Sequence, residues 1–221
     1  KPTMPQILKV ESNIEAVSAH ARKVLLQGGV IAFPTDTFYG LGVDPFNRDA
    51  VDRIFEIKGR EKNKPLFLLI SSKEQLKTLV RDITPAHYTL MRNFWPGPLT
   101  LLFQPRSVIP ESVSAGRIGI RQPGNSMTRD LISAFGQPIT APSANLAGEA
   151  PPTSAKQVDQ SLGKSLDLII DGGICPGGEP STLVDATKAP VQLIRPGAIP
   201  FSDIEVALRG NTTPNHPEVL G

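Results

Sequence analysis

The segment "IKGREKNKP" lies between two apolar runs and carries four cations within seven residues, Lys58, Arg60, Lys62 and Lys64. Its one acidic residue, Glu61, offsets a single positive charge. An arginine can bind a carboxylate or a phosphate through two parallel hydrogen bonds, and a lysine neutralises an anion as a compact charge. The segment therefore indicates either a site for an anion or an ordinary solvated loop face.

Polar residues gather in four more segments that are expected to be loops at strand ends: "PTDTFYGLG", "RIGIRQP", "APSANLAGEAPPTS" and the stretch from "GGEPSTLVD" to "LIRPG". Such loops are where α/β proteins usually place their functional residues. The segments offer cations, hydroxyls, amides and glycines, whereas acid–base pairs are scarce. That inventory suits the binding and polarising of anions.

Individual residues in these segments have two interpretations each. Arg117 and Arg121 are four apart in a strand-like run, so their side chains should share one sheet face and need a common anion or solvent. Ser143 and Asn145 of "SAN" either belong to a site or shape a turn. Asp36 is either a site carboxylate or an Asx-type loop organiser. The run "DGGICPGGEPST" is either a flexible loop or a backbone anion nest.

Composition excludes several classes of protein. A net charge of +2 does not describe a polycation that wraps nucleic acid, so anion binding must come from local clustering. The single cysteine, Cys175, excludes an internal disulfide framework, fits a reducing compartment and is expected to be inert. His20, His87 and His216 lack metal-ligand spacing. The sequence has no P-loop or GxGxxG motif, and its aromatic content of 5% offers no base-stacking platform.

Helical apolar spacing alternates with short apolar runs along the chain. The spacing predicts helices over residues 12–29, 48–59, 72–80, 85–94, 126–136, 154–163 and 202–210. The apolar runs predict strands within residues 30–37, 65–70, 99–103, 117–121, 138–141, 166–171, 182–186 and 191–195. The cationic segment is thus expected to connect a helix to a strand.

This alternation predicts a single α/β (α+β) domain. Because the late strands follow one another too closely for helical crossovers, the sheet should be mixed. Ser12 and Glu15 suggest a capping box for the first helix, and residues 201–221 should form a short helix and a polar tail. No apolar run approaches the roughly 20 residues that cross a bilayer, and the first residues lack a signal-peptide core. We expect a soluble, cytoplasmic protein.

Six segments taken together resemble the YrdC-like family in order and spacing: "GGVIAFPTDTFYGLG", "KGR" followed by "KPL", "IGIRQP", "APSANLAG", "STLVD" and "IRPG". The closest resemblance is to its L-threonylcarbamoyladenylate synthase branch, whose K-x-R and S-x-N pairs are intact here as Lys58 with Arg60 and Ser143 with Asn145. The resemblance implies a catalytic domain over residues 10–200, with a twisted mixed sheet, flanking helices and a concave basic cleft.

The resemblance also implies a nucleotidyltransferase activity. Family members make threonylcarbamoyl-AMP and pyrophosphate from L-threonine, bicarbonate and ATP, for the N6-threonylcarbamoyladenosine modification of tRNA. The implied partner is a downstream tRNA threonylcarbamoyl transferase complex, and no association with a membrane is implied. Direct contact with tRNA is left open. Mg²⁺ is expected with ATP, and because no carboxylate cluster is present, the phosphates rather than the protein should hold it.

The implied site residues fall into three groups. The threonine site would use Thr35, Phe67, Arg121, Ala141 and Ser181. The ATP site would use Lys58, Lys62, Arg117, Ser143, Pro151 and Arg195. The catalytic set would be Lys58, Arg60, Ser143 and Asn145.

Two alternatives stay open. One is a related carbamoyl-adenylate-forming enzyme, such as the homologous domain of hydrogenase-maturation carbamoyltransferases, although those larger chains carry cysteine-rich segments. The other is a non-catalytic RNA-binding module. The larger YrdC-like members also carry a further C-terminal domain after a linker, and the sequence stops soon after "IRPG", which leaves the closure of the site in question.

Overall fold

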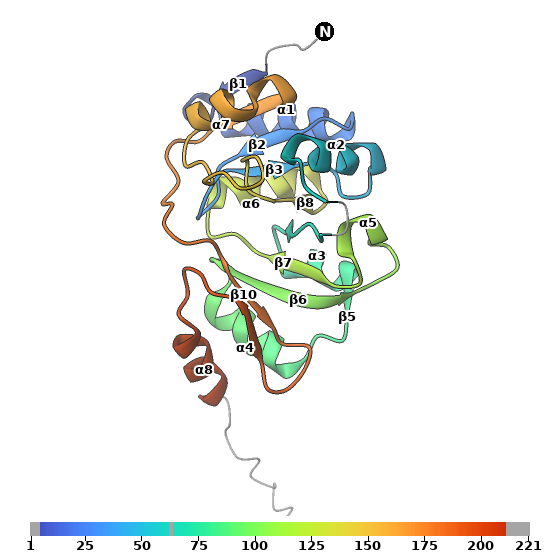
Figure 1. Cartoon of the computed structure of the whole chain (residues 1–221), viewed down its shortest axis with the longest axis vertical. Coiled ribbons are helices and arrows are strands. Elements are labelled where there is room, and N and C mark those ends of the chain that lie inside the picture. The colour runs from blue at the N-terminus through green and yellow to red at the C-terminus, as the bar shows by residue number, and fades with distance from the viewer. Residues whose placement is uncertain (1–4, 62–63, 211–221) are drawn as a thin grey trace, which may run out of the picture.

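Two β-sheets organise the chain in a computed structural model that describes residues 5–61 and 64–210 (Figure 1). The first sheet has the strand order β1–β9–β2–β3. Its β1–β9 and β9–β2 pairs are parallel, and its β2–β3 pair is antiparallel. The strands of this sheet are β1 (Gln6–Lys9), β2 (Ile31–Phe33), β3 (Gly40–Gly42) and β9 (Leu168–Asp171).

The second sheet has the order β11–β10–β6–β7–β4–β8, and β5 pairs with β6 beside this path. Its β6–β10 and β4–β7 pairs are parallel, and the other pairs are antiparallel. The expectation of a mixed α/β fold is therefore confirmed. The strands of this sheet are β4 (Leu68–Leu69), β5 (Val80–Arg81), β6 (Leu99–Pro105), β7 (Ile118–Arg121), β8 (Ile139–Thr140), β10 (Thr182–Asp185) and β11 (Gln192–Arg195).

The helices lie where the apolar periodicity predicted them, with one addition, α5. Figure 1 shows α1, α2 and α7 in the upper half, with the first sheet, and α4 and α8 in the lower half, where α8 packs beside α4. The helices are α1 (Ile14–Leu26), α2 (Arg48–Lys58), α3 (Lys73–Leu79), α4 (Pro85–Phe94), α5 (Glu111–Ser114), α6 (Ser126–Phe135), α7 (Ala155–Leu162) and α8 (Phe201–Arg209), with 3-10 turns η1 (Val10–Ser12) and η2 (Gly163–Ser165).

The start of α1 corrects one prediction. Asn13, not Ser12, is the N-cap: its side-chain oxygen accepts hydrogen bonds from the backbone N–H groups of Glu15 and Ala16 at 3.0 and 3.1 Å. The predicted capping box of Ser12 with Glu15 is wrong because the 3-10 turn η1 occupies the preceding residues. Asparagine and serine cap helices equally well, so composition could not separate the two positions.

A short backbone seam joins the two sheets. Ser143, which follows β8, forms an antiparallel bridge with Gly40 of β3. Leu41 N–H donates to the Pro142 carbonyl, and Ala144 N–H donates to the Tyr39 carbonyl, both at 2.8 Å. The sheets can meet here because β3 supplies glycines, whose missing side chains leave room for Phe33 of β2. The polar segments singled out in the sequence converge on this seam.

Two apolar clusters support the seam from either side. The larger cluster includes the inner faces of β6, β7 and β10 together with α2, α4 and Ile204 of α8. The smaller cluster packs α1 and α6 against β2 and β9. Within the described residues, no helix is long and apolar enough to cross a membrane.

Candidate functional site

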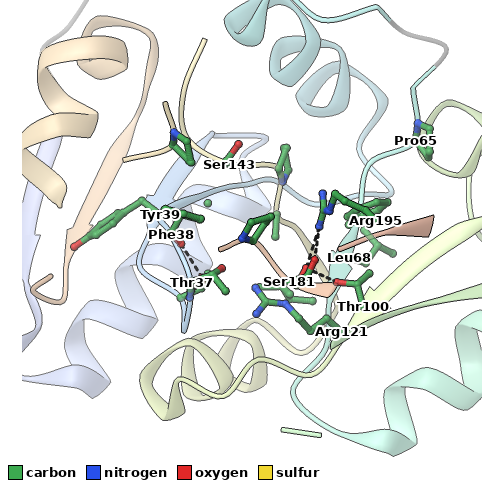
Figure 2. Close-up of a pocket in the computed structure, with 18 of the residues that line it drawn as sticks. Thr37, Phe38, Tyr39, Pro65, Leu68, Thr100, Arg121, Ser143, Ser181 and Arg195 are labelled. Atoms are coloured by element: carbon green, nitrogen blue, oxygen red, sulfur yellow. Dashed lines mark hydrogen bonds between the residues drawn. The ribbon is translucent and has the colours of Figure 1, made fainter. Parts of the chain in front are cut away.

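A cavity of about 470 Å³ opens beside the seam, with walls from both sheets (Figure 2). The β2–β3 connection supplies one wall, where Figure 2 shows Thr37, Phe38 and Tyr39. The second sheet supplies the opposite wall. The lining residues are Thr35, Thr37, Phe38, Tyr39, Gly40, Arg60, Pro65, Phe67, Leu68, Leu69, Thr100, Arg121, Ala141, Pro142, Ser143, Pro151, Gly178, Pro180, Ser181 and Arg195.

Sheet register places two arginines in this wall. Leu183 of β10 pairs with Arg195 of β11 on one side and with Thr100 of β6 on the other. In the antiparallel β6–β7 pair, Leu101 lies opposite Ile120, so extension of this register by one residue brings Thr100 opposite Arg121, which in turn pairs with Leu69 of β4. Residues directly opposite one another in a sheet share a face. One cross-strand row therefore brings Arg195, Thr100 and Arg121 to the same side of the cavity.

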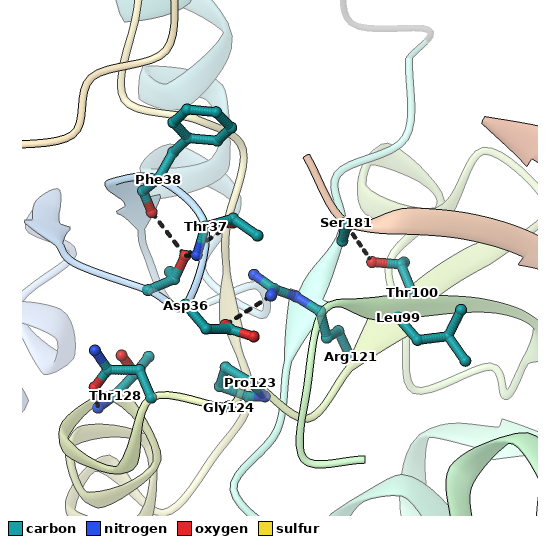
Figure 3. A network of polar contacts seen from close by, with 12 residues as sticks. Asp36, Thr37, Phe38, Leu99, Thr100, Arg121, Pro123, Gly124, Thr128 and Ser181 are labelled. Carbon is teal, nitrogen blue, oxygen red and sulfur yellow. Dashed lines mark hydrogen bonds and ion pairs between the residues drawn. The ribbon is translucent and has the colours of Figure 1, made fainter. Parts of the chain in front are cut away.

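Three guanidinium groups, those of Arg60, Arg121 and Arg195, face this cavity. Burial lowers the pKa of all three, and the charges of Arg121 and Arg60 lower the pKa of Arg195 further. Their carboxylate neighbour is Asp36, whose Oδ1 lies 2.7 Å from Arg121 Nη1 (Figure 3). Three cations beside one anion leave a surplus of positive charge, which favours an anionic ligand.

Two of the arginines keep buried donors free for such a ligand. Arg60 donates from Nη2 to the Pro65 carbonyl at 3.0 Å, and Arg195 donates from Nη2 to the Ser181 carbonyl at 2.8 Å. The Nε atoms of both arginines are buried and have no hydrogen-bond partner in the described part of the chain. A buried unpaired donor is destabilising, so an incoming oxyanion would gain these bonds at no loss of protein contacts.

Hydroxyl groups complete the polar lining. Thr35 Oγ1 donates to the Phe38 carbonyl at 2.7 Å and accepts from Thr37 N–H at 3.0 Å, which fixes the loop that faces the cavity. On the other wall, Ser181 Oγ lies 2.8 Å from Thr100 Oγ1 (Figure 3). These hydroxyls can donate to or accept from a polar ligand.

Phe67 forms an apolar floor beside these groups. Its ring lies over Gly119 of β7, where an added Cβ would come within 2.6 Å of the ring. The Arg195 guanidinium lies over the same ring, 5.7 Å from its centroid. The Phe67 carbonyl accepts from Ala141 N–H at 3.0 Å. Phe67 and Ala141 thus contribute shape and backbone to the cavity.

Lys58 does not line the cavity. It is the last residue of α2, is 5% exposed, and donates from Nζ to the carbonyls of Ser143 and Asn145, the second at 2.8 Å. Burial, with a smaller contribution from Arg60, lowers its pKa to about 8. The ammonium therefore contacts the backbone of the "SAN" loop in this structure rather than open space.

Asn145 faces a second, smaller hollow of about 220 Å³ next to the main cavity. Its Nδ2 donates to the carbonyls of Leu146 and Glu149, while its buried Oδ1 has no hydrogen-bond partner among the described residues. Pro151 lines both hollows and lies between them. Asn145 could therefore accept a hydrogen bond from a ligand that extends beyond Pro151.

Arg117 lies outside the cavity, before β7, whose far end carries Arg121. It is paired with Asp185 at 2.5 Å, and its side chain is 45% exposed. Of the two alternatives named above, a common anion or solvent, the structure shows no shared carboxylate among the residues that it describes: Arg117 pairs with Asp185 and is partly exposed to solvent, and Arg121 pairs with Asp36. Asp36, interpreted above as a loop organiser or a site carboxylate, is the partner of Arg121.

The structure thus distributes the predicted site residues in three ways. The cavity contains Thr35, Arg60, Phe67, Arg121, Ala141, Ser143, Pro151, Ser181 and Arg195. Lys58, Asn145 and Arg117 do not line it, and Lys62 is outside the described residues. Sequence reasoning did not single out Thr37 or Thr100. Thr37 could have been found from its place two residues after Thr35, whereas Thr100 is recognisable only from the sheet register.

The fold and the cavity define an α/β protein with a cavity between two sheets that is lined by arginine side chains and hydroxyl groups. A family model named for Sua5, YciO and YrdC, and described as "Telomere recombination", matches residues 23–197. The chain belongs to this family, which confirms the resemblance found in the sequence.

Three relatives illustrate the similarity. The chain is 38% identical to a threonylcarbamoyl-AMP synthase of Pyrococcus abyssi, over 99% of this chain and 64% of that one. It is 40% identical to a threonylcarbamoyl-AMP synthase of Bacillus subtilis, over 86% and 56% of the two chains. The crystal structure of P. abyssi Sua5 complexed with L-threonine superposes with a TM-score of 0.88 at 38% identity, over 93% of this chain and 61% of that one. The chain thus spans less than two thirds of these relatives.

Proposed function

We propose that the protein forms threonylcarbamoyl-AMP and pyrophosphate from L-threonine, bicarbonate and ATP, for the N6-threonylcarbamoyladenosine modification of tRNA. The observation that carries this proposal is the gathering of Arg60, Arg121 and Arg195 around one hydroxyl-lined cavity. The similarity to threonylcarbamoyl-AMP synthases and to a structure that holds L-threonine supports it.

The reaction requires three substrates, each of which carries at least one negatively charged group, to share one site. The threonine amine adds to the carbon derived from bicarbonate, with loss of water, and gives a carbamate. A carbamate oxygen then attacks the α-phosphorus of ATP, and the bond to the pyrophosphate oxygen breaks. No covalent intermediate with the protein is required. The main barrier that the protein must lower is repulsion between like charges, a task for preorganised cations.

The cavity offers a division of roles for these substrates. Arg121, oriented by Asp36, is suited to bind the threonine carboxylate. Thr35 and Ser181 line the same cavity, where they can contact the other polar groups of threonine. Arg60 and Arg195 keep free Nε donors for phosphate oxygens. Hydrogen bonds between charged groups contribute about 1.5–3 kcal/mol each.

Magnesium is proposed to enter with ATP. Within the described residues, no three His, Cys, Asp or Glu side chains gather to hold a metal ion. Mg²⁺ commonly binds through substrate phosphates and keeps several waters, so the residues present fit an ion carried by ATP. The downstream transferase complex, contact with tRNA and a cytoplasmic location also stay predictions.

The test is to incubate the protein with ATP, Mg²⁺, bicarbonate and each of several amino acids, to follow pyrophosphate, and to identify the adenylate by mass. Release should depend on threonine, and Arg195→Met should lower turnover at least about tenfold, whereas Arg22→Met on the exposed face of α1 should not. Pyrophosphate release without threonine would contradict the proposal. A different carbamoyl adenylate would favour the related enzyme, and salt-sensitive RNA binding without turnover would favour the RNA-binding module.

A further inference from the structure

The backbone of Ser181 is held in place at the cavity wall. Its carbonyl accepts a hydrogen bond from Arg195 Nη2 at 2.8 Å, and the neighbouring Pro180 carbonyl accepts from Ala198 N–H at 2.8 Å. Gly197 lies so close that an added Cβ would come within 2.6 Å of the Ser181 carbonyl carbon. The backbone is thus set, and a neighbouring side chain can still determine the direction of the hydroxyl hydrogen.

Thr100 of β6 is that neighbouring side chain. Its Oγ1 lies 2.8 Å from Ser181 Oγ, and the two residues are 2% and 8% exposed (Figure 3). The distance alone leaves open which hydroxyl donates, because each has one hydrogen and can accept two hydrogen bonds. In the part of the chain that the structure describes, Ser181 is the one hydrogen-bond partner of Thr100 Oγ1.

The cost of a buried, unpaired hydrogen decides the direction of this bond. If Ser181 donated to Thr100, the Thr100 hydrogen would have no acceptor, at a cost of about 1–3 kcal/mol. If Thr100 donates, its hydrogen is paired, and Ser181 Oγ accepts from Thr100 and from Arg195 Nη2, the latter at 3.2 Å. Both acceptor positions of Ser181 are then occupied. Its own hydrogen is left to donate into the cavity.

The hydroxyl on the opposite wall is arranged differently. Thr35 Oγ1 donates to the Phe38 carbonyl at 2.7 Å, so its hydrogen is already used within the protein. It also accepts from Thr37 N–H at 3.0 Å. Of the two hydroxyls that the resemblance implied for the threonine site, Ser181 is therefore the one that can donate to a ligand.

We propose that Thr100 is a positioning residue, which turns the Ser181 hydroxyl into a hydrogen-bond donor toward an oxygen atom of the bound threonine. This inference rests on the proposed function, because it adds a residue to the same site. An oxygen atom is the expected partner, since a hydroxyl whose two acceptor positions are occupied cannot accept from the ammonium group of the substrate. Thr100 acts through Ser181, because its own hydrogen is used in the bond between them.

The test compares Thr100→Val, which keeps the shape of the side chain and removes the hydroxyl, with Thr100→Ser, which keeps the hydroxyl. Thr78→Val, on the exposed face of α3, is the control. Thr100→Val should weaken L-threonine binding, measured by calorimetry, about fivefold, whereas Thr100→Ser should bind within about twofold of the wild type. The KM for ATP should change by less than about twofold in both, because Arg195 keeps its bond to the Ser181 carbonyl.

A double-variant cycle separates positioning from a general loss of structure. Ser181→Ala removes the group through which Thr100 acts. Adding Thr100→Val to Ser181→Ala should therefore weaken threonine binding by less than about a further twofold. Two losses that multiply in full would overturn the inference, because Thr100 would then act independently of Ser181. If Thr100→Val fails to fold, Thr100→Ala, which also lacks the hydroxyl, takes its place in the cycle.

Three further outcomes contradict the role of Thr100. They are threonine affinity in Thr100→Val equal to that of Thr78→Val, affinity in Thr100→Ser as low as in Thr100→Val, and a KM for ATP that rises as much as the threonine affinity falls. Each of these would leave the proposed function standing. A wild-type protein that binds no threonine would instead contradict the proposed function, and the inference with it.

Discussion

Asp36 and Arg121 form an ion pair whose side chains are 15% and 7% exposed. Burial of the guanidinium alone would be strongly unfavourable, and Asp36 offsets that effect in part. Because Asp36 belongs to the β2–β3 connection and Arg121 to β7, the pair also links the two walls of the cavity. Its Oδ1 binds Nη1 and leaves other guanidinium donors available. Asp36 should therefore orient Arg121 toward a substrate carboxylate.

Replacement of Asp36 tests this role. In Asp36→Asn the amide holds Arg121 less firmly, so the KM for threonine should rise about tenfold while the KM for ATP changes by less than about threefold. Steady-state kinetics with each substrate varied in turn gives both constants. Asp130→Asn, on the exposed face of α6, is the control. An equal rise in both KM values would show that Asp36 organises more of the site than Arg121.

The sequence and the family resemblance together pointed to the three arginines of the cavity and to several of its hydroxyl groups, because cations and hydroxyls between apolar runs are easily recognised. They could not show the orientations of these side chains. Lys58 and Arg60 looked equivalent until the left-handed Gly59 separated them. Arg117 looked like a partner of Arg121 because its real partner, Asp185, is 68 positions away and is known only from the fold.

Within strand β7, Gly119 leaves room for the Phe67 ring, because a Cβ at this position would lie 2.6 Å from a ring carbon. The ring in turn lies beneath the Arg195 guanidinium. A cation over an aromatic face is stabilised by about 0.5–2 kcal/mol. The absence of a side chain in one strand therefore sets the position of a cation from another.

Gly119→Ala should displace the ring, because the added Cβ would lie 2.6 Å from a Phe67 carbon. Arg195 should move with it, and turnover should fall about tenfold. The smaller side chain in the Gly119→Ala, Phe67→Leu double variant should recover part of that loss. Gly210→Ala serves as the control, since its Cβ meets no atom closer than 3.6 Å. If the double variant is worse than Gly119→Ala, the contact with Phe67 is not the cause.

Helix α4 begins with a capping box in which His87 plays the part usually taken by Glu or Gln. Thr84 N–H donates to Nδ1 at 3.1 Å, and Nε2 lies 2.9 Å from the Leu102 carbonyl. The ring stacks on Phe103 at 4.3 Å. Because Nδ1 accepts, Nε2 must carry the proton, and the neutral imidazole satisfies both contacts. Burial lowers the pKa of His87, opposed by the Leu102 carbonyl and Asp185.

The lowered pKa of His87 predicts the direction in which the stability of the protein changes with pH. The unfolded chain takes up a proton near pH 6.5 before the folded chain does, so stability present above about pH 6.5 is lost as the pH falls toward the folded value. His87→Gln retains the capping box and removes this titration. The difference in Tm between pH 7.5 and pH 5.5 should therefore shrink in His87→Gln and persist in His20→Gln. Equal pH dependence in wild type and His87→Gln would contradict this account.

The predictable elements were those whose signals are local. The helices have side-chain caps, glycine stops or a periodic apolar face. Strands β1, β3 and β5, and the short helix α5, were not predicted. Each has two to four residues, and β3 is Gly-Leu-Gly, which shows no strand periodicity. These strands form because partner strands elsewhere in the chain stabilise them through packing and pairing.

Helix α8 packs against the larger apolar cluster that forms the core of the molecule. Ile204 is fully buried within the larger apolar cluster, whereas Val206, two residues later, is 66% exposed. The predicted division at residue 200 stays a prediction, and this packing gives a direct test of it. Ile204→Ala should lower the free energy of unfolding by about 2–5 kcal/mol in urea denaturation. Val206→Ala should change it by less than about 0.5 kcal/mol. Equal effects would show that α8 behaves as an appendage.

Strand β9 lies between β1 and β2 in the first sheet, and Leu168 pairs with both Gln6 and Ile31. During synthesis, a nascent chain that has released β2 must therefore wait for β9, which lies 137 positions after Ile31. At 5–20 residues per second, the wait is roughly 7–27 seconds. Throughout that interval the earliest strands have unpaired edges, which can associate with other chains. Ribosome-bound intermediates should thus be the stage at which this protein depends most on chaperones.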